Sequence, residues 1–235
     1  MLKRRIVIYL AIVCLVMGIG VISFPHIEQK IYSAKADETA EEFDEWRMEL
    51  KENMPRSQNL AELFAKMQEY NDNLFISGQS EFTDAWSYQG ISFDLTKWGF
   101  EDNMIGYIDI PRMKIKLPLY LGATEENMRL GSVHLTETSL PISGNNSNCV
   151  IAGHRGYHGA AMFREIERLQ LEDEIYITNP WGRLTYRVFE LDIINPTDTQ
   201  KVMIQEGRDL ITLITCHPFR QNYQRYVVYA ERVIF

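Results

Sequence analysis

A run of uncharged residues near the N-terminus restricts this chain more than any other feature. The nineteen residues Ile6–Phe24 contain no charged side chain, and three basic residues at positions 3–5 precede them. At about 1.5 Å per residue, a helix of this length approaches the roughly 30 Å hydrocarbon core of a bilayer. Basic residues before such a helix favour a cytoplasmic N-terminus and export of everything that follows. The sequence therefore predicts a cytoplasmic basic end at residues 1–5 and a single transmembrane anchor at residues 6–25.

A cleaved signal peptide is the alternative interpretation of this run. Ala34-Lys35-Ala36 imitates the small-x-small pattern of a cleavage site. That triplet lies about ten residues beyond the apolar run, and the run exceeds the usual signal core of about 7–15 residues. A retained anchor is therefore favoured. Under either interpretation, the folded part lies outside the cell, and the retained anchor holds it at the cell membrane.

Composition excludes one class of partner. The chain is 46% apolar and 24% charged, which is typical of a globular protein, and its formal net charge is −8. Without the three basic residues at positions 3–5, 21 basic side chains remain against 32 acidic ones. A body this acidic repels polyphosphates, so we expect no nucleic-acid partner.

The next segments predict a helical arm and a linker. Residues 26–77 include an acidic stretch at 37–52 with apolar residues at i, i+3 and i+7, which predicts an amphipathic helix that Pro55 ends. A second apolar stripe over residues 60–74 predicts another helix. Residues 78–103 show neither period, so we expect them to form a long linker.

From Met104 onward, the apolar period changes from 3.6 to 2, which predicts many short strands and one short helix over residues 160–169. Many strands and few helices favour a β-barrel or sandwich over residues 104–235. The predicted strands are Met104–Ile110, Met113–Leu117, Asn148–Ala152, Glu174–Thr178, Leu184–Ile194, Asp209–Thr215 and Arg225–Phe235.

Three residues at strand ends are candidates for chemistry. Cys216 follows a strongly apolar strand, and a strand end that opens into a loop presents a nucleophile on a rigid support. His154 also lies where an apolar run stops, and Arg225 opens the last strand nine residues after Cys216. A thiol, an imidazole and a guanidinium together fit a nucleophile, its acid/base partner and an oxyanion stabiliser. Taken singly, each residue has an ordinary structural explanation, such as burial of a free cysteine.

A zinc site is the alternative for the same residues. Cys149, His154, His158 and Cys216 offer four potential ligands. Structural zinc sites usually contain tight pairs such as C-x₂-C, and here only the two histidines are close in sequence. We therefore expect no zinc site.

These segments resemble the sortase family, and most closely its class C, or pilin-type, members. Thr212–Cys216 reads Thr-Leu-Ile-Thr-Cys, which is similar to the family's Thr-Leu-x-Thr-Cys strand, and Ala152–Gly156 is similar to its histidine segment. Gln224–Tyr226 falls where the family has its arginine, while Gly106–Pro111 and Thr138–Pro141 are close to class C sequences. The likeness runs from about Met104 to the C-terminus.

The resemblance implies a closed eight-stranded β-barrel and a cysteine transpeptidase. Cys216 would attack the Thr–Gly bond of a Leu-Pro-x-Thr-Gly-like sorting signal, His154 would protonate the leaving amine, and Arg225 would stabilise the oxyanion. The thioacyl intermediate would then pass to an amine, usually a lysine of another pilin. No cofactor is implied. The implied partners are surface proteins or pilins that carry the sorting signal.

Two features depart from the class C pattern. Class C sortases often carry a lid with an Asp-Pro-aromatic triplet, and Asp84-Ala85-Trp86 is in a comparable place without the proline. The resemblance implies that Asp84 contacts Arg225 while Trp86 covers the sulfur of Cys216, although an ordinary linker is the alternative. Class C members also commonly have a C-terminal transmembrane helix, which is not seen before Phe235.

The second departure leaves other functions open. A cell-wall-anchoring sortase would use a peptidoglycan cross-bridge amine as the acceptor. A thiol hydrolase would pass the acyl group to water, and a non-catalytic tethered binding module would use none of the three residues chemically. The pilin-type transpeptidase is the preferred interpretation.

Overall fold

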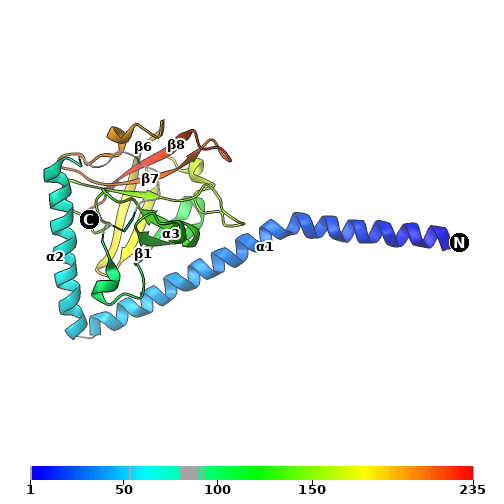
Figure 1. Ribbon diagram of the computed structural model, residues 1–235, viewed down its shortest axis with the longest axis horizontal. Coiled ribbons are helices and arrows are strands. Elements are labelled where there is room, and N and C mark those ends of the chain that lie inside the picture. The colour runs from blue at the N-terminus through cyan, green and yellow to red at the C-terminus, as the bar shows by residue number, and fades with distance from the viewer. Residues whose placement is uncertain (1, 53, 80–89, 92, 235) are drawn as a thin grey trace.

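The protein is described here by a computed structural model that covers residues 2–52, 54–79, 90–91 and 93–234. Two long helices, α1 (Leu2–Glu52) and α2 (Met54–Ser77), form a V beside a β-barrel (Figure 1). The N-terminal part of α1 extends far beyond the barrel, and the helix bends part-way along (Figure 1). It contains Pro25, which lacks the N–H needed for a regular helical hydrogen bond and therefore favours a bend.

Eight strands close into a barrel in the order β1-β2-β3-β4-β7-β8-β6-β5. The predicted closed eight-stranded barrel is therefore confirmed. Most neighbours are antiparallel, but β3 pairs with β2 and β7 pairs with β4 in parallel. The strands are β1 (Met104–Ile110), β2 (Ile115–Leu121), β3 (Ser132–His134), β4 (Ser147–Ala152), β5 (Glu174–Asn179), β6 (Gly182–Ile194), β7 (Asp209–His217) and β8 (Gln224–Arg232). The short helices are η1 (Leu95–Trp98), η2 (Pro111–Met113), α3 (Glu125–Leu130), η3 (Ile166–Arg168) and η4 (Thr199–Val202).

Helix α2 belongs to the hydrophobic core of the barrel domain. Its Leu63 and Met67 are buried in the same cluster as the inward-facing residues of the strands. The side-chain amide of Asn71 donates to the carbonyl of Leu140 (3.3 Å) and accepts from its N–H (2.7 Å). The indole of Trp181 donates to the carbonyl of Leu60 (3.2 Å). Since these groups are largely removed from water, the bonds fix α2 against the barrel.

Helix α1 packs on the outside of β1 and β2 through its C-terminal half. Phe43 meets the ring of Tyr107 edge-on, with centroids 6.2 Å apart, and the Tyr107 hydroxyl donates to Asp44 (2.8 Å). Nearer the N-terminus, the Tyr32 hydroxyl donates to the carbonyl of Leu130 (2.9 Å). The predicted apolar stripe of this helix therefore faces the barrel, as its spacing requires.

The predicted helix boundaries agree with the structure at one place and differ at another. The first helix ends at Glu52, before Pro55 as expected, and Pro55 itself lies in the first turn of α2, which begins at Met54 and tolerates a proline there. The helix expected over residues 160–169 reduces to the single turn Ile166–Arg168. Met162 has a positive φ of 41°, which no regular α-helix allows.

Candidate active site

Cys216, Arg225 and His154 come from the same end of three neighbouring strands. Near the end of β7, Cys216 lies directly opposite Arg225 of β8 in the antiparallel ladder. Strand β4 runs parallel to β7, with Ala152 opposite Ile214. Continuing that register by two residues sets His154 beside Cys216. The strand order therefore brings the three predicted residues to one edge of the barrel.

Hydrogen bonds hold the histidine segment against the cysteine strand. The buried hydroxyl of Thr215 donates to the carbonyl of Gly153 (2.7 Å), and the Gly153 N–H donates to the carbonyl of Ile214 (3.3 Å). The loop after β4 then turns back, so that the Phe163 N–H donates to the carbonyl of His154 (2.9 Å). Thr215 and Gly153, which directly precede Cys216 and His154, are thus fixed by hydroxyl and backbone bonds.

Burial and two guanidinium groups shift the pKa of the Cys216 thiol in opposite directions. The side chain is partly buried, and this desolvation raises its pKa above the ordinary 9.0 because it disfavours the thiolate. The positive charges of Arg225 and Arg155 lower the same pKa by a smaller amount. A thiolate formed here is therefore stabilised by two cations, although the resting group is a thiol at neutral pH.

The His154 imidazole is half-buried and stacks on the ring of Tyr157, with centroids 4.7 Å apart and an interplanar angle of 13°. Burial lowers its pKa below the ordinary 6.5, because the imidazolium loses hydration. The resting imidazole is consequently neutral near pH 7. This side chain is oriented by ring stacking and can gain or lose a proton during a reaction.

Arg225 is buried, with only 5% of its surface exposed. Its Nη1 donates to the carbonyl oxygens of Asn222 (2.7 Å) and Gln224 (2.9 Å). Both of these acceptors are neutral, and the positive charge of the guanidinium acts on the Cys216 thiol, whose pKa it lowers. Such a preorganised cation stabilises negative charge that develops next to the sulfur.

A second arginine, which sequence analysis did not assign, lies behind the cysteine. Arg155 is 7% exposed; its Nη1 donates to the carbonyl of Cys216 (3.3 Å) and to Nδ1 of His217 (2.9 Å). Its Nη2 pairs with Glu167 at 2.6 Å. Because Arg155 directly follows His154 in sequence, it links both candidate catalytic segments. Its position next to His154 was the signal in the sequence that could have pointed to Arg155.

The four residues considered for zinc do not lie together at one site. Cys149 is opposite Ile211 in the β4–β7 ladder, five positions before Cys216, which corresponds to roughly 16 Å along the strand. Burial raises the pKa of Cys149 strongly, so its thiol is inert inside the barrel. Over the described residues, no group of three or more histidine, cysteine, aspartate or glutamate side chains is arranged to hold a metal.

Asp84 and Trp86 lie outside the residues that the structure describes, so their contacts with Arg225 and Cys216 stay predictions.

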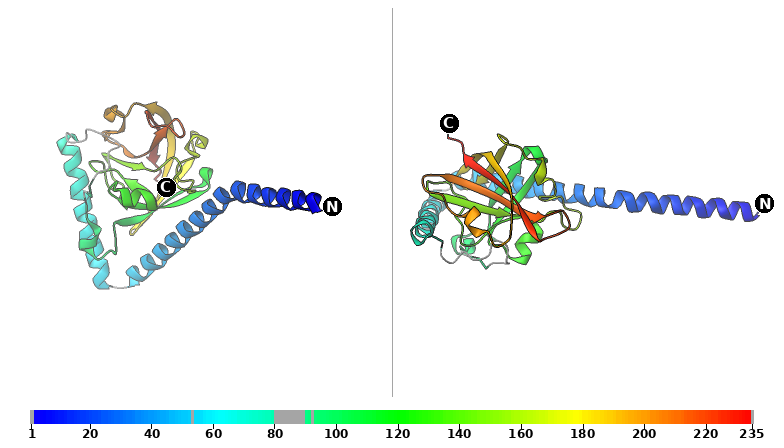
Figure 2. Two further views of the ribbon diagram at one scale, coloured as in Figure 1. Left: turned by 45° about the vertical axis from the view of Figure 1, so that its right-hand side comes forward. Right: turned by 90° about the horizontal axis from the view of Figure 1, so that it is seen from above.

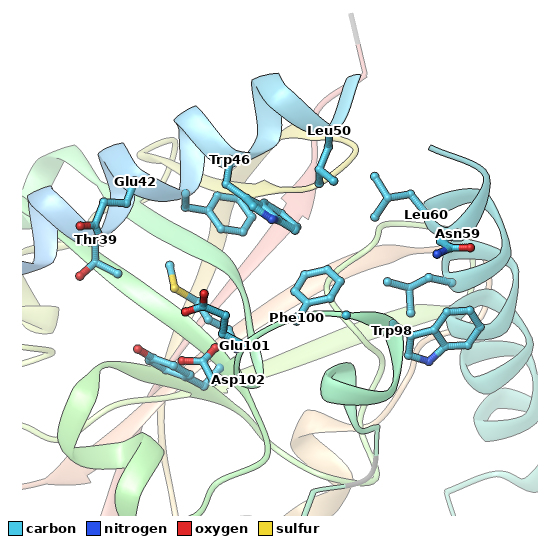
Figure 3. Close-up of a pocket in the computed structure, with 15 residues that line it drawn as sticks. Thr39, Glu42, Trp46, Leu50, Asn59, Leu60, Trp98, Phe100, Glu101 and Asp102 are labelled. Carbon is cyan, nitrogen blue, oxygen red and sulfur yellow. Dashed lines mark hydrogen bonds between the residues drawn. The ribbon is translucent and has the colours of Figure 1, made fainter. Parts of the chain in front are cut away.

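A cavity of about 810 Å³ lies in the corner between α1 and α2 (Figure 3). Aromatic side chains from α1 and from residues 98–100, including Trp46, Trp98 and Phe100, line it beside the carboxylates of Glu101 and Asp102. None of the three candidate catalytic residues contributes to its wall. This cavity is therefore separate from the candidate active site.

A match to a protein-family model identifies the family of this chain. A model of the sortase domain matches residues 108–233, which include Cys216, His154 and Arg225. The chain belongs to the sortase family. Among solved structures, this sortase resembles sortase C of Streptococcus pneumoniae (TM-score 0.74, 29% identity, 84% of this chain and 97% of that one). It also resembles sortase C of Clostridium perfringens SM101 (TM-score 0.66, 25% identity, 84% of this chain and 99% of that one).

Curated sortases are also similar in sequence to this chain, over a shorter range of residues. Sortase A of Bacillus anthracis is 32% identical over 130 residues, which cover 55% of this chain and 60% of the relative. Sortase D of Bacillus subtilis (strain 168) is 27% identical over 131 residues, covering 54% and 63%. The matched part therefore spans about three-fifths of the length of these relatives.

Proposed function

We propose that this sortase is a cysteine transpeptidase that cleaves a Leu-Pro-x-Thr-Gly-like sorting signal and joins the acyl part to an amine. The observation that carries the proposal is the position of Cys216 opposite Arg225, with the His154 segment bonded to the same strand. A nucleophile, a proton carrier and a fixed cation are thereby available around one peptide carbonyl.

The first half of the reaction forms a thioester. The Cys216 sulfur attacks the carbonyl carbon of the Thr–Gly bond, and the guanidinium of Arg225 stabilises the oxyanion of the tetrahedral intermediate. The imidazolium of His154 gives its proton to the departing glycine amine as the C–N bond breaks. In the second half, an incoming amine loses a proton to His154 and attacks the thioester, which releases the Cys216 thiolate.

The protonation states predict that only a small fraction of the enzyme is active at any moment. The thiol pKa is raised and the imidazole pKa is lowered, so the resting pair is neutral thiol and neutral imidazole. The reactive form, thiolate with imidazolium, is a minor species whose share is constant between the two pKa values. Below the imidazole pKa the thiolate is lost, and above the thiol pKa the imidazolium is lost. We therefore expect a bell-shaped pH profile for kcat/KM with a broad optimum between these limits.

A pilin lysine is the preferred acceptor. The S. pneumoniae sortase C structure is described in terms of pilin substrate specificity, and a group B Streptococcus sortase C with a TM-score of 0.68 is described as pilus-related. Coverage of 84% of this chain by the first of these extends beyond the barrel, so the likeness includes part of the helical arm. A peptidoglycan cross-bridge amine is the alternative acceptor.

We further propose that the protein is anchored in the cell membrane, with its N-terminus in the cytoplasm and the barrel outside. Within the described chain, one helix is long and apolar enough to span a bilayer, and no residue in its most apolar window is buried. Basic residues on its N-terminal side favour this orientation. Residues 6–25 would then form the anchor and residues 104–235 the external catalytic barrel.

The direct test combines the detergent-solubilised enzyme with a Leu-Pro-x-Thr-Gly peptide and a set of amines. We expect mass spectrometry to detect an acyl adduct on Cys216 and an amide product with a lysine-containing pilin peptide. Amide formed only with a cross-bridge peptide would assign the enzyme to cell-wall anchoring. A free acid in the presence of every amine would indicate a hydrolase, and the lack of any adduct would overturn the transpeptidase proposal.

The positive charge of Arg155 leads to a separate prediction about the pH profile. Because Arg155 lowers the pKa of the Cys216 thiol, its replacement in Arg155→Met should raise that pKa. We expect the alkaline limb of the kcat/KM profile to move to higher pH. The thiolate–imidazolium fraction on the plateau falls at the same time, so activity at pH 7.5 should drop by roughly tenfold.

Two variants distinguish this electrostatic role from a structural one. Arg155→Lys keeps the positive charge and should return the alkaline limb toward its original position. Arg208→Met removes an arginine that pairs with Glu231 at 2.7 Å, at the other end of β7, and should leave the limb unmoved. A loss of activity in Arg155→Met without any shift of the limb would refute the electrostatic role.

A further inference from the structure

The apolar part of α1 is joined to the barrel without an intervening linker. The uncharged run ends at Phe24, and α1 continues as one helix through Glu52. Only four residues beyond Phe24, the carboxylate of Glu28 lies against Gly159, where an added Cβ would be 2.7 Å from its Oε2. At about 1.5 Å per residue, this contact lies roughly 6 Å along the helix from the apolar run. The barrel must therefore begin close to the surface of any bilayer that the helix spans.

The part of the barrel that meets α1 here is the catalytic end. Gly159 belongs to the loop after β4 that carries His154, and the β7–β8 loop at residues 218–223 connects Cys216 to Arg225. Both loops extend along α1 toward its N-terminus, whereas α2 lies on the opposite side of the barrel (Figures 1 and 2). The two views agree, so the two loops that adjoin the candidate catalytic residues lie at the end of the barrel nearer the anchor.

The β7–β8 loop has the composition of a lipid-contacting segment. Phe219 is 43% exposed and Tyr223 is 59% exposed, although both belong to the same six-residue loop. The guanidinium of Arg220 lies 5.4 Å from the centre of the Phe219 ring. Residues 218–223 contain no carboxylate. Exposed rings with a flexible cation are typical of the boundary between lipid headgroups and hydrocarbon.

Two carboxylates on the segment after β4 are paired with cations on the protein. Glu165 binds Arg168 at 2.8 Å, and Glu167 binds Arg155 at 2.6 Å. Their repulsion toward an anionic lipid surface is thereby reduced. Among the residues that the structure describes, no carboxylate pairs with Arg220, so its positive charge is available to an anionic surface.

We propose that the β7–β8 loop rests in the headgroup layer of the membrane, with Phe219 and Tyr223 at the interface, and that the active site faces the bilayer. The inference rests on the proposed anchor. It has a consequence for substrate entry: a sorting signal carried close to the membrane reaches Cys216 directly. A peptide free in solution must instead enter between the barrel and the lipid surface.

The test is depth-dependent fluorescence quenching on the full chain in nanodiscs of phosphatidylcholine and phosphatidylglycerol. A bimane probe is attached at Tyr223→Cys in a chain that also carries Cys14→Ala and Cys216→Ala, while the buried Cys149 is left in place. The matched probe is attached at Ile76→Cys, because Ile76 is 80% exposed at the end of α2, far from the anchor (Figure 1). Lipids spin-labelled near the headgroup serve as the quencher.

We expect the Tyr223 probe to be quenched about threefold more than the Ile76 probe, as for an interfacial residue. Equal quenching of the two probes, or none at Tyr223, would overturn the proposal. A Tyr223 probe that responds only when a sorting-signal peptide is added would assign the loop to substrate binding instead. Acyl transfer by the unmodified chain is measured in the same nanodiscs, so a failure of the proposed activity is recognised independently of the quenching result.

Discussion

Replacement of Cys216 by alanine is expected to abolish both the acyl adduct and the amide product. Without the sulfur, neither His154 nor Arg225 has a covalent intermediate on which to act, so the reaction cannot be divided into its two steps. We expect kcat/KM to fall by about 10⁴-fold or more. Peptide cleavage and adduct formation, both followed by mass spectrometry, measure the loss.

Cys149 provides the matched control within the same barrel. It is only 3% exposed, and burial raises the pKa of its thiol, so it reacts with neither peptide nor alkylating agent. The Cys149→Ala variant should lose some stability but retain the adduct on Cys216. If an acyl adduct persisted in Cys216→Ala and vanished in Cys149→Ala, the nucleophile would have been assigned to the wrong strand.

The candidate catalytic positions stand out in the sequence because each lies where a local pattern stops. Apolar runs end at Ala152 and Thr215, and in a closed barrel the ends of paired strands come together. The sequence shows these ends clearly, since buried strands are strongly apolar. The strand ends are brought together by the parallel pairing of β4 with β7, which depends on the strand order and is visible only in the structure.

Arg155 shows what local patterns cannot reveal. Its partners are the carbonyl of Cys216, the imidazole of His217 and the carboxylate of Glu167, which lie 12 or more positions away along the chain. The sequence contains many arginines, and nothing around this one predicts that its side chain is buried. Burial follows from the loop after β4 folding back against β7. A long-range ion pair of this kind requires the tertiary structure.

The helix predicted over residues 160–169 is absent for a local reason. Apolar residues there do recur at helical spacing, and Met162, Phe163, Ile166 and Leu169 are all buried. These side chains are buried on a loop made of turns rather than on a helix. The chain folds back there, and the Phe163 N–H donates to the carbonyl of His154. Periodicity therefore identified the buried side chains correctly while the backbone took a path set by the active site.

The largest effect on folding is expected from Gly106→Ala. Gly106 has a φ of 155°, and it lies in β1 where the pairing with β2 is irregular. A Cβ at this position would overlap the carbonyl oxygen of Thr178 in β5 and lie 2.9 Å from its carbonyl carbon. The two strands would have to separate, and backbone strain would be added to this steric cost. We expect the free energy of unfolding to fall by about 3 kcal/mol or more.

Thermal unfolding of the detergent-solubilised chain, followed by near-ultraviolet circular dichroism, measures this loss; we expect the Tm to fall by roughly 10 °C. The control is Gly182→Ala, because Gly182 opens β6 and an added Cβ there has no atom within 4 Å. That variant should unfold close to the original temperature. Equal stability of both variants would show that β1 and β5 do not approach as closely as the barrel requires.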